Sequence, residues 1–330
     1  MKVLFWGTPP FAVASLRALD DEGFDIVGVV TQPDRPAGRG RRLQPSAVKE
    51  VALDQGFPVL TPDRPRGDDF MKEIRALEPD ISVVVAYGHI LRREVLDVPP
   101  LGSINVHASL LPELRGAAPI NWAIARGHSK SGITIMRMVE ALDAGPMLHC
   151  LQEPILHDET ASELTARLSE VGAEALVEAL ALLTAGVIVE KPQDDDLATF
   201  APKVERATAR VNWSLPAVEV SRLIRAMDAV PGAWSEISGA PVKLYRPQVV
   251  PHHLVDPPRT PGAAGNGGPP PGALAPVPGQ VVWADGERGI LIAAGEGGVL
   301  VTEVQPPGKR RMSAQDWVNG RGVVSGQRFE

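Results

Sequence analysis

The chain is poor in cysteine and has no long apolar segment. Its 330 residues include one cysteine, Cys150. One thiol cannot close a disulfide within the chain or supply a thiolate metal cluster, so nothing requires an oxidising compartment, and we expect a cytoplasmic protein. The apolar run after Met1 resembles a signal peptide until Gly7 and Pro9 interrupt it. No window approaches the roughly 18 apolar residues that cross a bilayer, so we expect a soluble protein without a membrane partner.

The sequence also lacks the glycines of a dinucleotide-binding turn. That fingerprint is Gly-x-Gly-x-x-Gly, which lets the backbone approach a pyrophosphate. The first strand is followed instead by Gly7, Thr8, Pro9, Pro10 and Phe11. A proline ring removes an amide donor from the helix end. The sequence therefore argues against a nicotinamide or flavin enzyme.

Acidic residues outnumber basic residues, and the excess is unevenly distributed along the chain. Lys and Arg total 33 against 40 Asp and Glu, a net charge of -7, which argues against a nucleic-acid partner because phosphate binding depends on basic surface. Residues 201–330 hold 14 Lys and Arg against 11 Asp and Glu, a balance of +3, which leaves -10 for residues 1–200. Any RNA contact must therefore come from local basic clusters.

The first part of the chain alternates between short branched apolar runs and segments of helical period, which predicts an α/β domain with a Rossmann-like, mostly parallel sheet. We expect strands at 3–6, 26–30, 59–60, 81–86, 104–106 and 133–138, and helices at 11–19, 46–55, 68–77 and 160–184. We assign residues 1–190 to this N-terminal domain and the polar, acidic residues 191–206 to a linker.

The last part of the chain has a different pattern. A short helix ends near Met227, and brief strand-like runs follow at 234–237, 242–245, 280–283, 290–293 and 299–304. Short strands broken by Gly and Pro predict a small antiparallel β-barrel, of the OB-like kind, in a C-terminal domain at 207–330. Half of residues 251–280 are Pro or Gly, so we interpret this stretch as a flexible loop whose role is unknown.

Three polar residues follow two of the predicted strands. Asn105 and His107 are two positions apart, so their side chains emerge on the same side of a strand, and Asp143 follows the strand at 133–138. Parallel sheets bind ligands at the carboxyl ends of their strands. An amide, an imidazole and a carboxylate suit acyl transfer to an amine, which needs donors for an oxyanion and an acceptor for a proton. Each residue alone is also compatible with a structural polar group or a turn residue.

The motifs around these residues are specific. Asn-x-His-x-Ser-Leu-Leu-Pro begins at Asn105, Arg-Gly-Ala-Ala-Pro begins at Arg115, and Leu-Asp-x-Gly begins at Leu142. Together they resemble the signature of the folate-dependent formyltransferases. The likeness is strongest to the branch that acts on methionyl-tRNA, and it covers nearly the whole chain. It is carried further by the stretches at 7–12, 31–40, 83–88, 209–214 and 312–316.

The resemblance implies formyl transfer from 10-formyltetrahydrofolate to the α-amino group of initiator methionyl-tRNA, in support of translation initiation. Asn105 would donate to the formyl oxygen, and His107, as a donor, would stabilise the oxyanion. Asp143 would orient the imidazole and help pass the amine's proton, through water. The folate site carries over onto Ser109, Leu110, Leu111 and Pro112, with the backbone near Tyr87, Gly88 and Ile90 and around 142–145.

A basic cluster between residues 34 and 49 points to RNA. Five basic side chains stand there against Asp34, a balance of +4. Such a charge cluster is also compatible with an ordinary solvent-exposed loop. In the family that the sequence resembles, however, this loop enters the acceptor stem of the tRNA. Our expected RNA contacts are Arg35, Arg39, Arg41 and Arg42, with Lys309 and Arg310 as a second basic group in the C-terminal domain.

The sequence departs from the family pattern at two places, and two other functions are compatible with it. Glu113 and Leu114 stand where the family usually has a basic and then an aromatic residue, and the loop at 251–280 is longer than the family needs. The chain could instead be a formyltransferase acting on a sugar-nucleotide or purine-precursor amine, or an RNA-binding protein without activity. His149, His252 and His253 lack convergent ligand partners, so we expect no metal site. We also expect no obligate protein partner.

Overall fold

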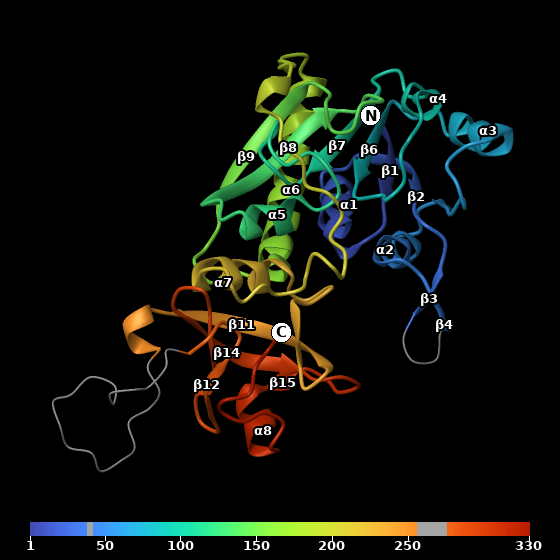
Figure 1. The fold of residues 1–330 in the computed structure, drawn as a ribbon. Coiled ribbons are helices and arrows are strands. Elements are labelled where there is room, and N and C mark those ends of the chain that lie inside the picture. Colours follow the sequence, from blue (N-terminus) through green and yellow to red (C-terminus); the bar gives the residue numbers. More distant parts are fainter. Residues whose placement is uncertain (38–41, 256–275) are drawn as a thin grey trace, which may run out of the picture. The chain divides into compact units, whose positions relative to one another are not determined.

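The computed structural model describes residues 1–37, 42–255 and 276–330 and divides them into two compact units (Figure 1). Unit 1 comprises residues 1–120, 129–155 and 163–202. Unit 2 comprises residues 203–330 together with two short earlier stretches, 121–128 and 156–162. Residues 191–202, inside the expected linker, belong to unit 1.

Unit 1 is built on a mixed sheet whose strands run in the order β5-β2-β1-β6-β7-β8-β9 within the described residues. Neighbouring strands are parallel from β5 to β7, whereas β8 is antiparallel to β7 and β9 to β8. The strands are β1 (Lys2–Gly7), β2 (Asp25–Val30), β5 (Val59–Leu60), β6 (Ile81–Val85), β7 (Ser103–His107), β8 (Lys130–Arg137) and β9 (Met147–Pro154). The predicted Rossmann-like, mostly parallel sheet is confirmed.

Helices pack on both faces of this sheet. Leu4, Trp6 and Val84 share a core with the apolar faces of α3 and α4. On the other face α6 lies so close that a Cβ at Gly172 would stand 3.2 Å from Val106. The helical elements of this part of the chain are η1 (Pro10–Ala12), α1 (Val13–Asp21), α2 (Ala47–Asp54), α3 (Asp68–Ala76), α4 (Arg93–Leu96), α6 (Ala161–Thr184) and η2 (Asp195–Leu197). Helix α5 (Pro119–Ala125) begins in unit 1, and its remaining residues belong to the stretch 121–128 of unit 2. Pro10 opens the first helical turn, where its missing amide donor leaves no bond unmade.

A small hairpin follows β2. Its strands are β3 (Arg35–Ala37) and β4 (Arg42–Gln44), which pair antiparallel from Arg35 with Gln44 to Ala37 with Arg42. Leu43 exposes 69% of its surface in this hairpin. The hairpin therefore presents side chains of the predicted basic cluster outside the main sheet.

Unit 2 is an antiparallel sheet with the strand order β10-β11-β14-β13-β12, and β15 pairs with β14. Its elements are α7 (Ala217–Ala226), β10 (Trp234–Ile237), β11 (Ala240–Val250), η3 (His252–Leu254), β12 (Val281–Asp285), β13 (Gly289–Ala293), β14 (Gly298–Gln305), β15 (Met312–Ser313) and α8 (Ala314–Asn319). The sheet curls into a half-barrel, which confirms the predicted small β-barrel architecture. Val255, from the predicted loop, is buried against Val282 and Leu291; the loop's centre, 256–275, lies outside the described residues.

The last residues of the chain join the two ends of this half-barrel. Phe329 forms a bridge to Ile237 at the end of β10, and Arg328 forms one to Gln280 just before β12. Phe329 is fully buried, and its ring packs 5.9 Å from that of Trp213. The indole of Trp213 in turn donates to Ser235 Oγ at 2.9 Å. The carboxyl-terminal segment thus contributes to the core of unit 2.

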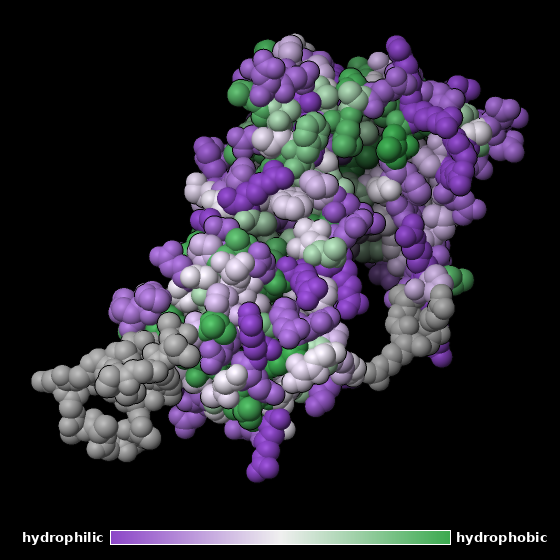
Figure 2. Space-filling view, in the orientation of Figure 1, coloured by the Kyte–Doolittle hydropathy of each residue, from purple (hydrophilic) through white to green (hydrophobic). Residues whose placement is uncertain are grey.

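No helix in the described ranges is long and apolar enough to cross a membrane. The face shown in Figure 2 is largely polar, with apolar side chains gathered in the upper part of the view.

Candidate active site

Strand β7 places the first two candidate residues. Asn105 and His107 alternate with Val106, so both side chains leave the same face of the strand. Asn105 pairs with Val84 on one side and with Met136 on the other, near the middle of the sheet. Among the described residues its side-chain amide has no hydrogen-bond partner. An amide of this kind is available to a ligand.

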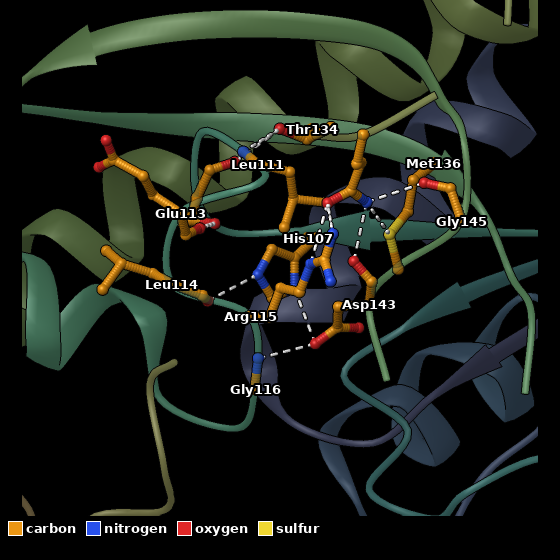
Figure 3. A network of polar contacts seen from close by, with 12 residues as sticks. His107, Leu111, Glu113, Leu114, Arg115, Gly116, Thr134, Met136, Asp143 and Gly145 are labelled. Carbon is orange, nitrogen blue, oxygen red and sulfur yellow. Dashed lines mark hydrogen bonds and ion pairs between the residues drawn. The ribbon is translucent and has the colours of Figure 1, made fainter. Parts of the chain in front are cut away.

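His107 lies between two fixed groups (Figure 3). Its Nε2 is 3.1 Å from the carbonyl oxygen of Leu114, and its Nδ1 is 3.7 Å from Oδ2 of Asp143. The side chains of His107 and Asp143 expose only 6% and 14% of their surface. The structure therefore brings the predicted imidazole and carboxylate together at the carboxyl end of β7.

These contacts decide the protonation of the imidazole. A carbonyl oxygen only accepts, so Nε2 carries a hydrogen and donates it to Leu114. Burial lowers the pKa of His107, whereas the Asp143 carboxylate and the Leu114 hydrogen bond act to raise that pKa. The resting ring is therefore neutral, with the free lone pair on Nδ1. Nδ1 can take up a proton, and Asp143 would stabilise the charged form.

Asp143 stands in the turn between β8 and β9, and its conformation is unusual. Its φ of 50° lies in the left-handed region, which side chains other than that of glycine adopt at a cost. Its Oδ2 accepts a hydrogen bond of 2.8 Å from the backbone nitrogen of Gly116. Gly116 has a φ of 124°, and an added Cβ would stand 2.6 Å from the oxygen of Ala201. Only glycine therefore fits where this backbone meets the carboxylate.

The tetrapeptide expected to bind folate follows the end of β7 after one intervening residue. Ser109 is buried, and its hydroxyl donates to the carbonyl oxygen of Glu113 at 2.6 Å. Thr134 on β8 donates to the carbonyl oxygen of Ser109 at 2.7 Å. It also accepts from the nitrogen of Leu111 at 3.2 Å (Figure 3). The segment from Ser109 to Pro112 is thus tied to the sheet through Thr134, and the serine hydroxyl serves the loop's own structure.

Comparison with known proteins agrees with this geometry. Residues 1–180 match the formyl transferase family, and residues 203–322 match the formyl transferase C-terminal domain. A methionyl-tRNA formyltransferase of Symbiobacterium thermophilum is 46% identical over 329 residues, covering 100% of this chain and 95% of that protein. The enzyme of the same name from Pseudomonas paraeruginosa is 44% identical over 322 residues, 97% of this chain and 96% of that protein. The chain belongs to the methionyl-tRNA formyltransferase family.

Solved structures share the fold at low sequence identity. HypX from Aquifex aeolicus in complex with tetrahydrofolic acid has a TM-score of 0.63 and 19% identity, covering all of this chain and 51% of that one. The methionyl-tRNA formyltransferase from Clostridium thermocellum has a TM-score of 0.55 and 14% identity, covering 75% of this chain and 93% of that one. At these identities the likeness concerns the fold alone.

The loop after β6 of this formyltransferase lines a hollow. Tyr87 is buried edge-on against Trp6 with ring centroids 5.3 Å apart, and burial raises the pKa of its phenol to about 12. Its carbonyl oxygen accepts from Thr8 and Gln32. Gly88, with φ of 89°, and Ile90, 85% exposed, line a hollow of about 470 Å³. Its remaining lining residues are Asp63, Arg64, Pro65, Arg66, His89 and Arg92.

Three arginines in that hollow, with one aspartate, make it suited to an anion. Sequence reasoning did not find them, because Arg64 and Arg66 stand in an irregular segment before α3 and Arg92 stands before α4. No local spacing in the sequence joins the two segments.

The basic hairpin has fewer free cations than the sequence suggested. The guanidinium of Arg35 donates to Gln32 Oε1, and Lys49 pairs with Asp34 at 2.7 Å. Arg42 is exposed and has no partner among the described residues. Arg39 and Arg41 lie outside the described residues. Of the predicted contacts that the structure describes here, Arg42 is therefore the one available to a phosphate.

In unit 2 the second basic group is divided. Lys309 and Arg310 are exposed, and their side chains have no partner in the described ranges. The adjacent Arg311 is bound to Glu303 and Asp228, and its guanidinium lies 4.0 Å from the centre of the Tyr245 ring. Arg311 is structural, whereas its two neighbours are available.

The unusual pair Glu113 and Leu114 has a local explanation in part. Leu114 is 2% exposed with a φ of 62°, and its carbonyl oxygen is the one that holds His107. An apolar side chain suits that burial. Glu113 is exposed.

No group of three or more His, Cys, Asp or Glu that could hold a metal occurs among the described residues.

Proposed function

We propose that this chain transfers the formyl group of 10-formyltetrahydrofolate to the α-amino group of initiator methionyl-tRNA, with Asn105, His107 and Asp143 as its catalytic residues. The observation that supports these roles is the 3.7 Å approach of His107 Nδ1 to Asp143 Oδ2, on the face of β7 where the Asn105 amide has no partner among the residues that the structure describes. Membership of the family supports the reaction and both substrates.

Each group has a defined chemical task. The amine attacks the formyl carbon, which forms a carbon–nitrogen bond and places negative charge on the formyl oxygen. Asn105 donates an N–H to that oxygen. His107 takes a proton from solvent at Nδ1 before the attack and keeps it throughout, so it is a second donor whose charge Asp143 stabilises. Asp143 also accepts, through water, the proton that the amine loses. The bond between the formyl carbon and the folate nitrogen then breaks, and Asp143 passes the amine's proton, through water, to that nitrogen, which regenerates the carboxylate.

Substrate recognition follows from the other predicted residues. We assign the folate to Ser109, Leu110, Leu111 and Pro112, with the backbone of Tyr87, Gly88 and Ile90. The RNA is assigned to Arg39, Arg41 and Arg42 of the hairpin and to Lys309 and Arg310 of unit 2. Arg35 has a weaker claim, because Gln32 already binds it. The exposed cation at Arg42 supports a nucleic-acid acceptor over a sugar-nucleotide or purine-precursor amine.

Three expectations complete the proposal. The catalytic domain corresponds to residues 1–190, the linker to 191–206 and the RNA-contacting domain to 207–330. The protein acts in the cytoplasm, and it works without an obligate protein partner.

The test is formylation of methionyl-tRNA by the purified protein with 10-formyltetrahydrofolate as donor. We expect turnover, and we expect Asn105→Ala and His107→Ala each to lower kcat by about a hundred- to a thousandfold, the usual cost of losing one oxyanion donor. His157→Ala is the matched control, because His157 is 91% exposed. Folded Asn105 and His107 variants with full turnover, or transfer to a sugar-nucleotide amine instead of methionyl-tRNA, would overturn the proposal.

A further inference from the structure

Gln193 turns inward from an exposed segment. Its neighbours Pro192 and Asp194 are exposed, whereas Gln193 is half-buried. Its Nε2 donates to the carbonyl oxygens of Asp143 and Gly145, both at 2.8 Å. These two carbonyls flank Ala144. One side-chain amide therefore binds both sides of the turn that carries the candidate carboxylate.

Arg115 sets the orientation of that amide. Its Nε and Nη2 donate to Gln193 Oε1 at 3.0 and 2.8 Å. A guanidinium has donors only, so the oxygen of Gln193 must face Arg115 and its amino group must face the turn. Arg115 is 5% exposed, and a buried charge requires a partner. Asp195, whose side chain is 81% exposed, supplies it at 2.7 Å.

The turn is one that needs support. The left-handed φ of Asp143 is persistent only where surrounding contacts hold it. Gly116, the residue after Arg115, holds the carboxylate at 2.8 Å, and Gln193 holds the main chain. Arg115 thus fixes the main chain of Asp143 through Gln193, and the next residue, Gly116, fixes the side chain of Asp143.

We propose that Gln193, oriented by the buried Arg115, is a positioning residue that keeps the Asp143 carboxylate within reach of His107. Gln193 has no contact with the reacting atoms in this role; it acts through the turn at 143–145. The inference rests on the catalytic roles proposed for His107 and Asp143.

Two variants test it. Gln193→Leu removes both donated hydrogen bonds, and Gln193→Glu also removes them but keeps an oxygen partner for Arg115, so that folding is preserved. We expect kcat to fall by about tenfold to a hundredfold in both, the loss typical of a small misplacement of a catalytic group. The KM for methionyl-tRNA should stay within about twofold, because the lost contact concerns the chemical step. A kcat within twofold of the parent in the folded Glu variant overturns the inference.

A double-mutant cycle adds a readout that a purely structural role would not move. If Gln193 acts through Asp143, Gln193→Glu should lower kcat far less in an Asp143→Asn protein than in the parent. Equal losses in the two backgrounds would overturn the inference. Gln55→Glu is the matched control, because it makes the same amide-to-carboxylate change at an exposed position just after α2, away from Arg115 and Asp143.

Failure of this inference differs from failure of the proposed function. An Asp143→Asn protein with full activity would contradict the catalytic assignment itself. Loss of activity in Asp143→Asn together with full activity in both Gln193 variants would contradict only the positioning role.

Discussion

His107 shows how a single residue obtains its properties from two neighbours and from burial. The Leu114 carbonyl fixes which nitrogen carries the hydrogen, burial favours the neutral ring, and Asp143 favours the charged ring. The sequence predicted the pairing of His107 with Asp143. It gave no indication of the Leu114 contact, because a carbonyl oxygen is present in every residue and only the fold determines which one meets the imidazole.

The first prediction concerns the pKa of this imidazole. Because Asp143 acts to raise the pKa of His107, Asp143→Asn should lower that pKa below its already lowered value in the parent. Imidazole signals followed by NMR during a pH titration measure the shift, with the exposed ring of His157 as internal control. An unchanged or raised pKa of His107 in the variant would show that the carboxylate does not act on the ring.

The same shift has a consequence for stability. The unfolded chain has a His107 pKa of about 6.5, and the folded pKa is lower, so acid favours the unfolded state. The contribution of the buried neutral ring to the free energy of unfolding is therefore complete above about pH 6.5. It declines as the pH falls from there toward the folded pKa.

The segment between β7 and α5 is the element on which the site depends. It contains the tetrapeptide at Ser109, the Leu114 carbonyl that binds His107 and the Gly116 nitrogen that binds Asp143. Antiparallel pairing of His107 with Thr134 places the threonine hydroxyl under the tetrapeptide. Sequence reasoning missed Thr134, because only the strand register brings it to this place.

Thr134 therefore offers a prediction at the scale of the element. Thr134→Val keeps the shape but leaves the Ser109 carbonyl and the Leu111 nitrogen without that partner, at a cost of about 1–3 kcal/mol for each buried group. We expect a lower free energy of unfolding and a raised KM for 10-formyltetrahydrofolate. Chemical denaturation and steady-state kinetics measure the two effects.

Thr134→Ser is the matched variant, because it retains the hydroxyl and loses one methyl group. It should keep the parent KM for the folate. An equal rise of KM in the Ser and Val variants would mean that packing of the methyl group, and not the hydrogen bonds, orders the tetrapeptide.

Hydrophobic periodicity in the sequence predicted most helices and strands. Whether a strand was predicted depended on how deeply it is buried. The runs that became β1, β2, β6 and β7 were recognisable because buried parallel strands are nearly continuous in apolar residues. Strand β9 was missed. It is an edge strand whose residues mostly alternate between partly buried and exposed, and its polar members His149, Gln152 and Glu153 interrupt the apolar run.

Charge is the property that belongs to the whole molecule. The net charge of -7 would suggest a protein that avoids RNA. The structure divides the basic residues into those already paired, such as Lys49 and Arg311, and those still available, such as Arg42 and Arg310. The sequence could locate the basic clusters but could not make this division, because the acidic and amide partners follow from the fold.

The salt dependence of tRNA binding tests the hairpin. Replacing Arg41 and Arg42 together by alanine should raise the KM for methionyl-tRNA and reduce the slope of log affinity against log salt by about 0.7–0.9 per lost phosphate contact. The KM for the folate should not change. Arg17→Ala on α1 is the control, because Arg17 is exposed outside the hairpin. An unchanged slope in the double variant would exclude the hairpin as a phosphate contact.

The loop between β7 and α5 also limits how such an enzyme can diverge. Donor recognition and the alignment of the reacting groups are both assigned to this loop, whose hydrogen bonds through Thr134, Leu114 and Gly116 serve the two tasks together. A substitution in this loop that alters donor recognition therefore also disturbs the alignment of the reacting groups. New acceptor preferences can therefore evolve more freely in the hairpin and in unit 2, where substitutions leave the reaction centre intact.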